Sequence, residues 1–111
     1  ALPICDGSAQ REFMHADDAG SACVLCMLKY NESGPINIAA GEEISIRDLA
    51  ELLVKETGYT GQLIWDTTKP AGTPRKGLDI SKLLALGWQQ QYKLAQGIPL
   101  AIEWYKQNIV K

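Results

Sequence analysis

The sequence lacks a basic excess and a long apolar run. Its 111 residues include 11 basic and 13 acidic side chains, which gives a formal net charge of −2. Proteins that bind nucleic acid usually carry a basic patch or excess, because neutralising phosphates drives their affinity. The longest apolar stretch, residues 22–28, is far shorter than the roughly 20 residues that span a bilayer as a helix. We therefore expect neither a nucleic-acid nor a membrane partner.

Cysteine is also scarce, with only Cys5, Cys23 and Cys26 in the chain. An odd count without a dense framework argues against a secreted disulfide scaffold, and no signal-like start precedes it. We expect a reducing, cytoplasmic location. Cys23 and Cys26 form a C-x-x-C pair inside an apolar helical stretch, where core packing is the favoured role. A zinc or redox role stays open as an alternative, with only His15 and Cys5 as further ligands.

No G-x-G-x-x-G run follows a predicted strand, so we expect no dinucleotide cofactor in this chain. The single histidine, His15, has no aligned nucleophile, and we interpret it as structural. Trp65, Trp88 and Trp104 occupy apolar positions and are expected to pack in the core. These patterns predict no catalytic residue and no metal ligand.

The chain does have enough apolar residues, 46% of the total, for one domain over residues 1–111. Short strands alternating with helices predict an α/β fold, small and α+β-like, with about four helices. We expect strands at residues 11–15, 36–39 and 62–65. We expect helices over residues 16–30, between 45 and 58, over 81–86, and at the C-terminal end.

Two helices carry clear boundary signals. Ser45 and Asp48 match a capping box, and Gly58 suits a left-handed helix end. Ile46, Leu49, Ala50 and Leu53 form the expected buried stripe of that helix. The last helix has an apolar stripe from Ile98 through Ile102, Tyr105 and Ile109. Because Pro99 would disturb a helix interior, we predict that this helix begins near Ile98 rather than Leu94.

The first helix, which opens with Asp17 and Asp18, has no polar face over residues 22–28. A helix that is apolar all round is normally covered on several sides. A domain this small has little material to cover it. We therefore expect Val24, Leu25 and Leu28 to be buried by a second copy of the chain or by another domain.

Arg11 is the first candidate binding residue. Its guanidinium offers a planar fork of donors that matches phosphate oxygens, and a strand would place it at the edge of a sheet. The alternative is a surface arginine that pairs with Glu12 or Asp17.

The loop over residues 66–77 supplies three more cations, Lys69, Arg75 and Lys76. Pro70, Gly72 and Pro74 restrict this loop, which therefore has little freedom to lose when it binds a diphosphate. The alternative is a solvated basic loop without a ligand.

Several runs of residues together resemble the GDP-L-fucose synthase family. The resemblance extends in order over nearly the whole chain and includes residues 11–19, 41–50, 65–70, 72–76, 78–83, 86–88 and 103–105. Members of that family convert GDP-4-keto-6-deoxy-D-mannose to GDP-L-fucose with NADPH. Their N-terminal Rossmann domain supplies the cofactor site and the catalytic tyrosine and lysine, and a smaller C-terminal domain holds the GDP-sugar.

The resemblance covers only that smaller part, about the last third of the family's length. None of the four tyrosines has a lysine four residues later, so we expect the chain to be inactive alone. The resemblance implies that Arg11 contacts the GDP moiety and that Lys76 lies near the diphosphate. We count Arg75, a cation of the same loop, as a further candidate substrate-binding residue. It also implies either a homo-oligomer or a missing Rossmann domain as partner.

The chain departs from the family pattern at two places that bear on the ligand. Ile4 and Cys5 stand where the family has a Trp-Gly run, and Ala71 stands where it usually has aspartate. Losing a charged hydrogen bond costs about 1.5–3 kcal/mol, or roughly ten- to a hundredfold in affinity. These changes favour a second hypothesis, a non-enzymatic module that binds a nucleotide or serves assembly.

Overall fold

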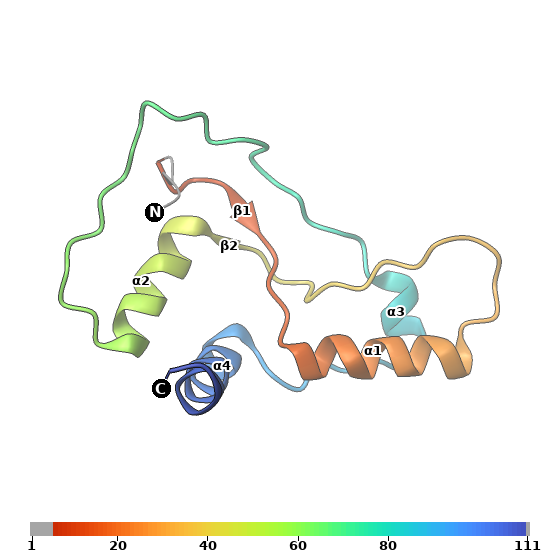
Figure 1. Cartoon of the computed structure of the whole chain (residues 1–111). Helices are drawn as coiled ribbons and strands as arrows, with labels where there is room; N and C mark the ends of the chain where they lie inside the picture. The colour runs from red at the N-terminus through yellow and green to blue at the C-terminus, as the bar shows by residue number, and fades with distance from the viewer. Residues whose placement is uncertain (1–5, 111) are drawn as a thin grey trace.

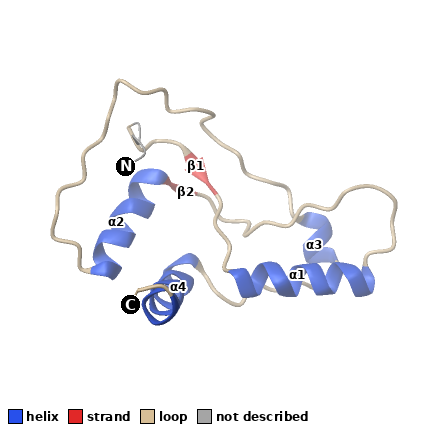
Figure 2. Cartoon of the chain, in the orientation of Figure 1, coloured by secondary structure: helices blue, strands red, loops and turns tan. Residues whose placement is uncertain are grey.

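The computed structural model describes residues 6–110, and over this range it forms four helices and one antiparallel two-stranded sheet. The predicted class of small mixed domain with about four helices is confirmed. Figures 1 and 2 show the elements β1 (Gln10–Arg11), α1 (Ala16–Lys29), β2 (Ile44–Ser45), α2 (Ile46–Thr57), α3 (Ser81–Ala85) and α4 (Leu94–Asn108).

The molecule is open and elongated. In Figure 1, α1 and α3 lie at one end and α2 and α4 at the other, with β1 and β2 between them. The Cα radius of gyration is 16.5 Å, whereas a compact domain of this length has about 13 Å. Consequently the helices leave much apolar surface uncovered.

The central core is small and lies where α1 meets α3. Ala22, Leu83 and Trp88 form its fully buried cluster, and Trp88 donates its indole N–H to Ser21 Oγ at 3.1 Å. Of the seven buried hydrophobic residues among those described, four are alanines. Because alanine buries little area, each large core side chain carries a large share of the packing energy.

Local signals placed both ends of α2 correctly. Ser45 Oγ accepts the N–H of Asp48 at 3.0 Å, and Gly58 ends α2 with a φ of 67°. At α1, His15 Nδ1 accepts the N–H of Asp17 at 3.1 Å, which satisfies an otherwise unpaired helix amide. The structural interpretation of His15 therefore has a definite basis in capping.

The strand predictions were mostly wrong. The strand expected at 11–15 is only β1, and neither 36–39 nor 62–65 forms a strand. Beyond Arg11 the side chain of Glu12, rather than a backbone carbonyl, accepts the N–H of Gly41. Asn37 likewise donates its side-chain amide to Asp79 O at 3.1 Å. A strand needs backbone-to-backbone pairing, whereas both of these contacts join a side chain to a backbone.

The prediction for the start of α4 was also wrong, because the helix begins at Leu94 and contains Pro99. Pro99 has no N–H to donate, so one carbonyl in the first turn of α4 loses its usual helical partner. Other contacts hold that turn. The Lys93 N–H donates to Gln96 Oε1 at 3.1 Å, and Gly97 packs so closely on His15 that an added Cβ would lie 3.3 Å from the ring.

Several side chains expected in the core are not buried, including Trp65 and every member of the predicted α2 stripe. Trp104 is 60% exposed, Leu53 is 39% exposed and Cys23 is exposed, because no element covers their faces. Cys26, by contrast, packs against the core cluster as predicted. No helix within residues 6–110 combines the length and apolarity needed to cross a bilayer. The cellular location stays a prediction.

Candidate functional site

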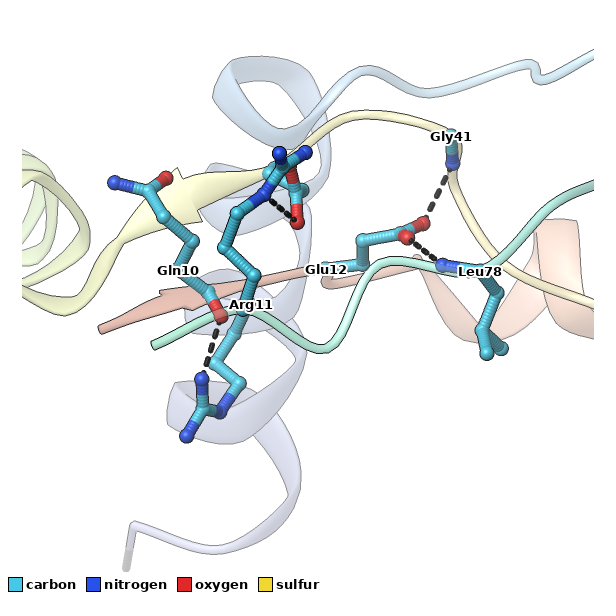
Figure 3. Close-up of polar contacts among 7 residues, drawn as sticks. Gln10, Arg11, Glu12, Gly41 and Leu78 are labelled. Carbon is cyan, nitrogen blue, oxygen red and sulfur yellow. Dashed lines mark hydrogen bonds and ion pairs between the residues drawn. The ribbon is translucent and has the colours of Figure 1, made fainter. Parts of the chain in front are cut away.

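Arg11 lies at the end of β1, where two backbone carbonyls orient its guanidinium. Nη1 donates to Gln10 O at 2.6 Å (Figure 3) and to Thr73 O at 2.8 Å. Arg11 forms no ion pair with any described residue, so the alternative of a pair with Glu12 or Asp17 is wrong. Its charge is thus not neutralised by a neighbouring carboxylate at contact distance.

Lys76 lines the same pocket as Arg11. This pocket has a volume of about 270 Å³, and we call it the Arg11–Lys76 pocket. Residues 38–40 and Leu78 provide most of its remaining wall. Two residues that lie far apart in the chain thus line one pocket.

Arg75 is held elsewhere. Its Nε donates to Glu43 Oε2 at 3.0 Å and to Oε1 at 3.2 Å, and its Nη2 also contacts Oε2. The hydrogen bond from Arg75 lowers the pKa of Glu43, and the same bond raises the pKa of Arg75. The pair borders a second, more polar pocket of about 430 Å³ beside Gly77. The structure thus separates Arg75 from the Arg11–Lys76 pocket.

The other loop positions lie away from this pocket. Lys69 follows a turn in which Asp66 Oδ1 accepts the N–H of Thr68 at 3.0 Å, and it lines neither pocket. Ala71, where a carboxylate was expected by resemblance, is half-buried. Ile4 and Cys5, the other departure, lie outside the described residues.

Sequence reasoning missed Glu12, which it considered only as an ion-pair partner. One carboxylate oxygen accepts the N–H of Gly41 at 2.8 Å, and the other accepts the N–H of Leu78 at 2.7 Å (Figure 3). Both donors are distant in sequence. Only the adjacency of Glu12 to Arg11 hinted at its importance.

A larger and more apolar pocket of about 660 Å³ lies between the start of α1 and the first turns of α4. His15 and Tyr92 contact each other in its wall with ring centroids 4.8 Å apart. In the same wall His15 Nδ1 lies 3.8 Å from Asp17 Oδ2, which is beyond hydrogen-bond distance. Among residues 6–110, no three His, Cys, Asp or Glu side chains cluster in a way that would hold a metal ion.

Comparisons with known proteins define the class. No family model matches the chain. It superimposes with a TM-score of 0.88 and 27% identity on a GDP-L-fucose synthetase from Naegleria fowleri bound to NADP, covering 95% of this chain and 34% of that one. It also superimposes on a UDP-glucose 4-epimerase from Thermotoga maritima with UDP-glucose, with a TM-score of 0.85 and 26% identity. That match covers 96% of this chain and 34% of the epimerase chain. The fold is a portion of an extended short-chain dehydrogenase/reductase.

Sequence comparison finds curated relatives over most of the chain. The chain is 46% identical over 103 residues to GDP-L-fucose synthase 1 of Arabidopsis thaliana. The aligned region covers 93% of this chain and 32% of that protein. The chain is homologous to GDP-L-fucose synthases over most of its length. It spans about a third of the length of the curated relatives that it matches.

Proposed function

We propose that this chain is the part of a GDP-L-fucose synthase-like, NADPH-dependent epimerase/reductase that holds the diphosphate of a GDP-sugar. The observation that supports it most is the shared pocket of Arg11 and Lys76. Neither cation has an ion-pair partner among the described residues. Two cationic residues that line one concave site without ion-pair partners suit a small dianionic ligand.

The arrangement of Arg11 reduces the entropy that binding would cost. The carbonyls of Gln10 and Thr73 already fix one edge of its guanidinium. The remaining donors are thereby presented in a defined direction, so fewer rotamers are lost when a phosphate binds. Arg75 is a weaker candidate for the same ligand, because it would first have to leave Glu43.

The proposed activity needs more than this chain contains. A nicotinamide cofactor needs a dinucleotide site, and the 111 residues contain no G-x-G-x-x-G run and no Tyr-x-x-x-Lys pair. We therefore expect the purified chain to bind a nucleotide sugar without reducing it. Steady NADPH oxidation by the chain alone, in the presence of the ketosugar, would contradict this expectation.

Isothermal titration calorimetry with GDP and GDP-fucose tests the binding proposal. Arg11→Ala should weaken binding by roughly ten- to a hundredfold, because it removes a charge-assisted contact. Lys76→Ala should weaken binding by a similar factor. Lys69 belongs to the same loop but does not line the pocket, so Lys69→Ala should leave the affinity unchanged. Equal effects of the two lysine variants would indicate only general electrostatic attraction.

The second candidate function is a non-enzymatic module. The capture of Arg75 by Glu43 and the loss of a carboxylate at Ala71 favour it, because both weaken a nucleotide site. A wild-type chain that binds neither GDP, GDP-fucose nor a UDP-sugar in calorimetry would support this module and reject the first proposal.

We also propose that the isolated chain self-associates through α1. Val24, Met27 and Leu28 are 52%, 78% and 73% exposed, and their helical spacing makes them one continuous apolar surface. A second copy would bury this surface by a two-fold contact. Light scattering should show a dimer in the wild type and a monomer after Leu28→Glu, with Lys29→Glu as the neighbouring control. A wild type that stays monomeric at millimolar concentration would refute the contact.

A further inference from the structure

We propose that Glu12 is a positioning residue that holds Lys76 beside Arg11, and this inference rests on the proposed binding function. Glu12 follows Arg11 directly in the chain and lines the same pocket. Its carboxylate connects three segments that are far apart in sequence, namely the end of β1, the approach to β2 and the loop after Lys76 (Figure 3).

The loop that carries Lys76 is attached to β1 on both sides of the lysine. On one side, the Gln10 N–H donates to Pro74 O at 2.8 Å, and Arg11 Nη1 donates to Thr73 O at 2.8 Å. On the other side, the Leu78 N–H donates to Glu12 at 2.7 Å. Only three residues lie between these attachments, so their backbone has little freedom. Removing the second attachment would release the lysine from its place beside Arg11.

Glu12 also fixes the opposite wall of the pocket. Its second oxygen accepts the N–H of Gly41 at 2.8 Å. Gly41 directly follows Ala39 and Ala40, which line the Arg11–Lys76 pocket. The carboxylate of Glu12 thus fixes the distance between the wall formed by Ala39 and Ala40 and the loop that carries Lys76.

A carboxylate in an anion-binding pocket requires an explanation, because it would repel a phosphate. Each oxygen of Glu12 is engaged by a backbone amide, which disperses its negative charge. The nearby carboxylate of Glu43 is similarly neutralised by Arg75. Gly77 lies against both acids, since an added Cβ would be 2.8 Å from Glu43 Oε1 and 3.4 Å from Glu12 Oε1. Arg75 thus offsets the charge of Glu43 beside the pocket.

The test is a double-mutant cycle with inorganic pyrophosphate as the titrated probe. Glu12→Gln keeps one acceptor oxygen and so loses one of the two amide bonds. Pyrophosphate affinity should fall roughly tenfold. If Glu12 acts through Lys76, the same change made in a Lys76→Ala chain should alter affinity less than twofold, because neighbouring residues that act together are not additive.

Glu42→Gln is the matched control. Glu42 directly follows Gly41 in sequence and is exposed. It pairs with Lys93 at 3.3 Å and does not line the Arg11–Lys76 pocket. It should leave affinity unchanged in both backgrounds. An equal fall for Glu12→Gln with and without Lys76 would overturn the proposal, because a merely structural residue would weaken both chains alike. Glu12→Asp, which keeps the charge but is too short to reach both amides, replaces Glu12→Gln if that variant does not fold.

A failure of the proposed function would be recognised separately. If the wild type binds neither pyrophosphate nor GDP, the binding proposal fails while the positioning role can still be decided. Hydrogen exchange of at least one of the Gly41 and Leu78 amides, both of which donate to Glu12, should then be faster in Glu12→Gln and unchanged in Glu42→Gln. Unchanged exchange of both amides in Glu12→Gln would reject the role of Glu12.

Discussion

Replacing Asp18 with alanine should lower the free energy of unfolding by about 3–6 kcal/mol, since each of its two part-buried hydrogen bonds to a charged acceptor is worth about 1.5–3 kcal/mol. The side chain is only 1% exposed. Oδ1 accepts the N–H of Gln91 at 2.8 Å, and Oδ2 accepts the N–H of Tyr92 at 2.9 Å. No other described group replaces the carboxylate at these amides.

Asp18 matters because it connects two distant parts of the chain. It lies in the first turn of α1, where a negative charge also complements the helix dipole. Gln91 and Tyr92 belong to the segment that leads into α4. Their attachment to α1 fixes where α4 begins, and it keeps Tyr92 against His15.

Asp17→Ala is the matched control for this prediction. Asp17 precedes Asp18 in the same turn, but its side chain is 70% exposed. Surface substitutions of this kind usually change stability by no more than about 0.5 kcal/mol. Urea denaturation followed by circular dichroism compares the two variants. Equal losses would mean that the two amides find other partners and that Asp18 has no special role.

The second large effect is expected for Leu83→Ala, which should destabilise the chain by about 2–5 kcal/mol. Leu83 is fully buried in the cluster with Ala22 and Trp88. Truncation removes its apolar area and leaves a cavity that the short helix α3 is poorly able to close. Because small domains are stable by only about 5–15 kcal/mol in total, such a loss would populate the unfolded state.

Leu84→Ala provides the comparison. It removes the same atoms from the adjacent position of α3, but Leu84 is 52% exposed. Its effect on the urea midpoint should therefore be much smaller than that of Leu83→Ala. A similar shift for both leucines would show that the cluster around Leu83 does not dominate stability.

The contrast between helices and strands shows which parts of the fold were predictable. The cap of α2 needs only Ser45 and the amide of Asp48, three residues apart, and its end needs only Gly58. These short-range contacts are visible in the sequence. The extended segments at 36–39 and 62–65 had strand-like patterns, yet no backbone lies where it would pair with them. Pattern alone does not supply a partner strand.

Burial was predictable only in part, for the same reason. Trp88 and Cys26 lie in or against the core cluster as expected, because α3 is close to α1. Trp104 has an equally apolar position on its helix but is 60% exposed. What differs is the presence of a covering element, which the helical period does not reveal.

The sequence by itself determined the class of fold, the starts of α1 and α2, the family resemblance, and the choice of Arg11 and Lys76 as candidate ligand contacts. Only the tertiary structure decided that these two cations share a pocket, that Glu43 holds Arg75, and that Glu12 and Asp18 each accept hydrogen bonds from two distant amides. The physical reason is range. A cap or a left-handed turn depends on residues within a few positions, whereas these contacts depend on the path of the whole chain.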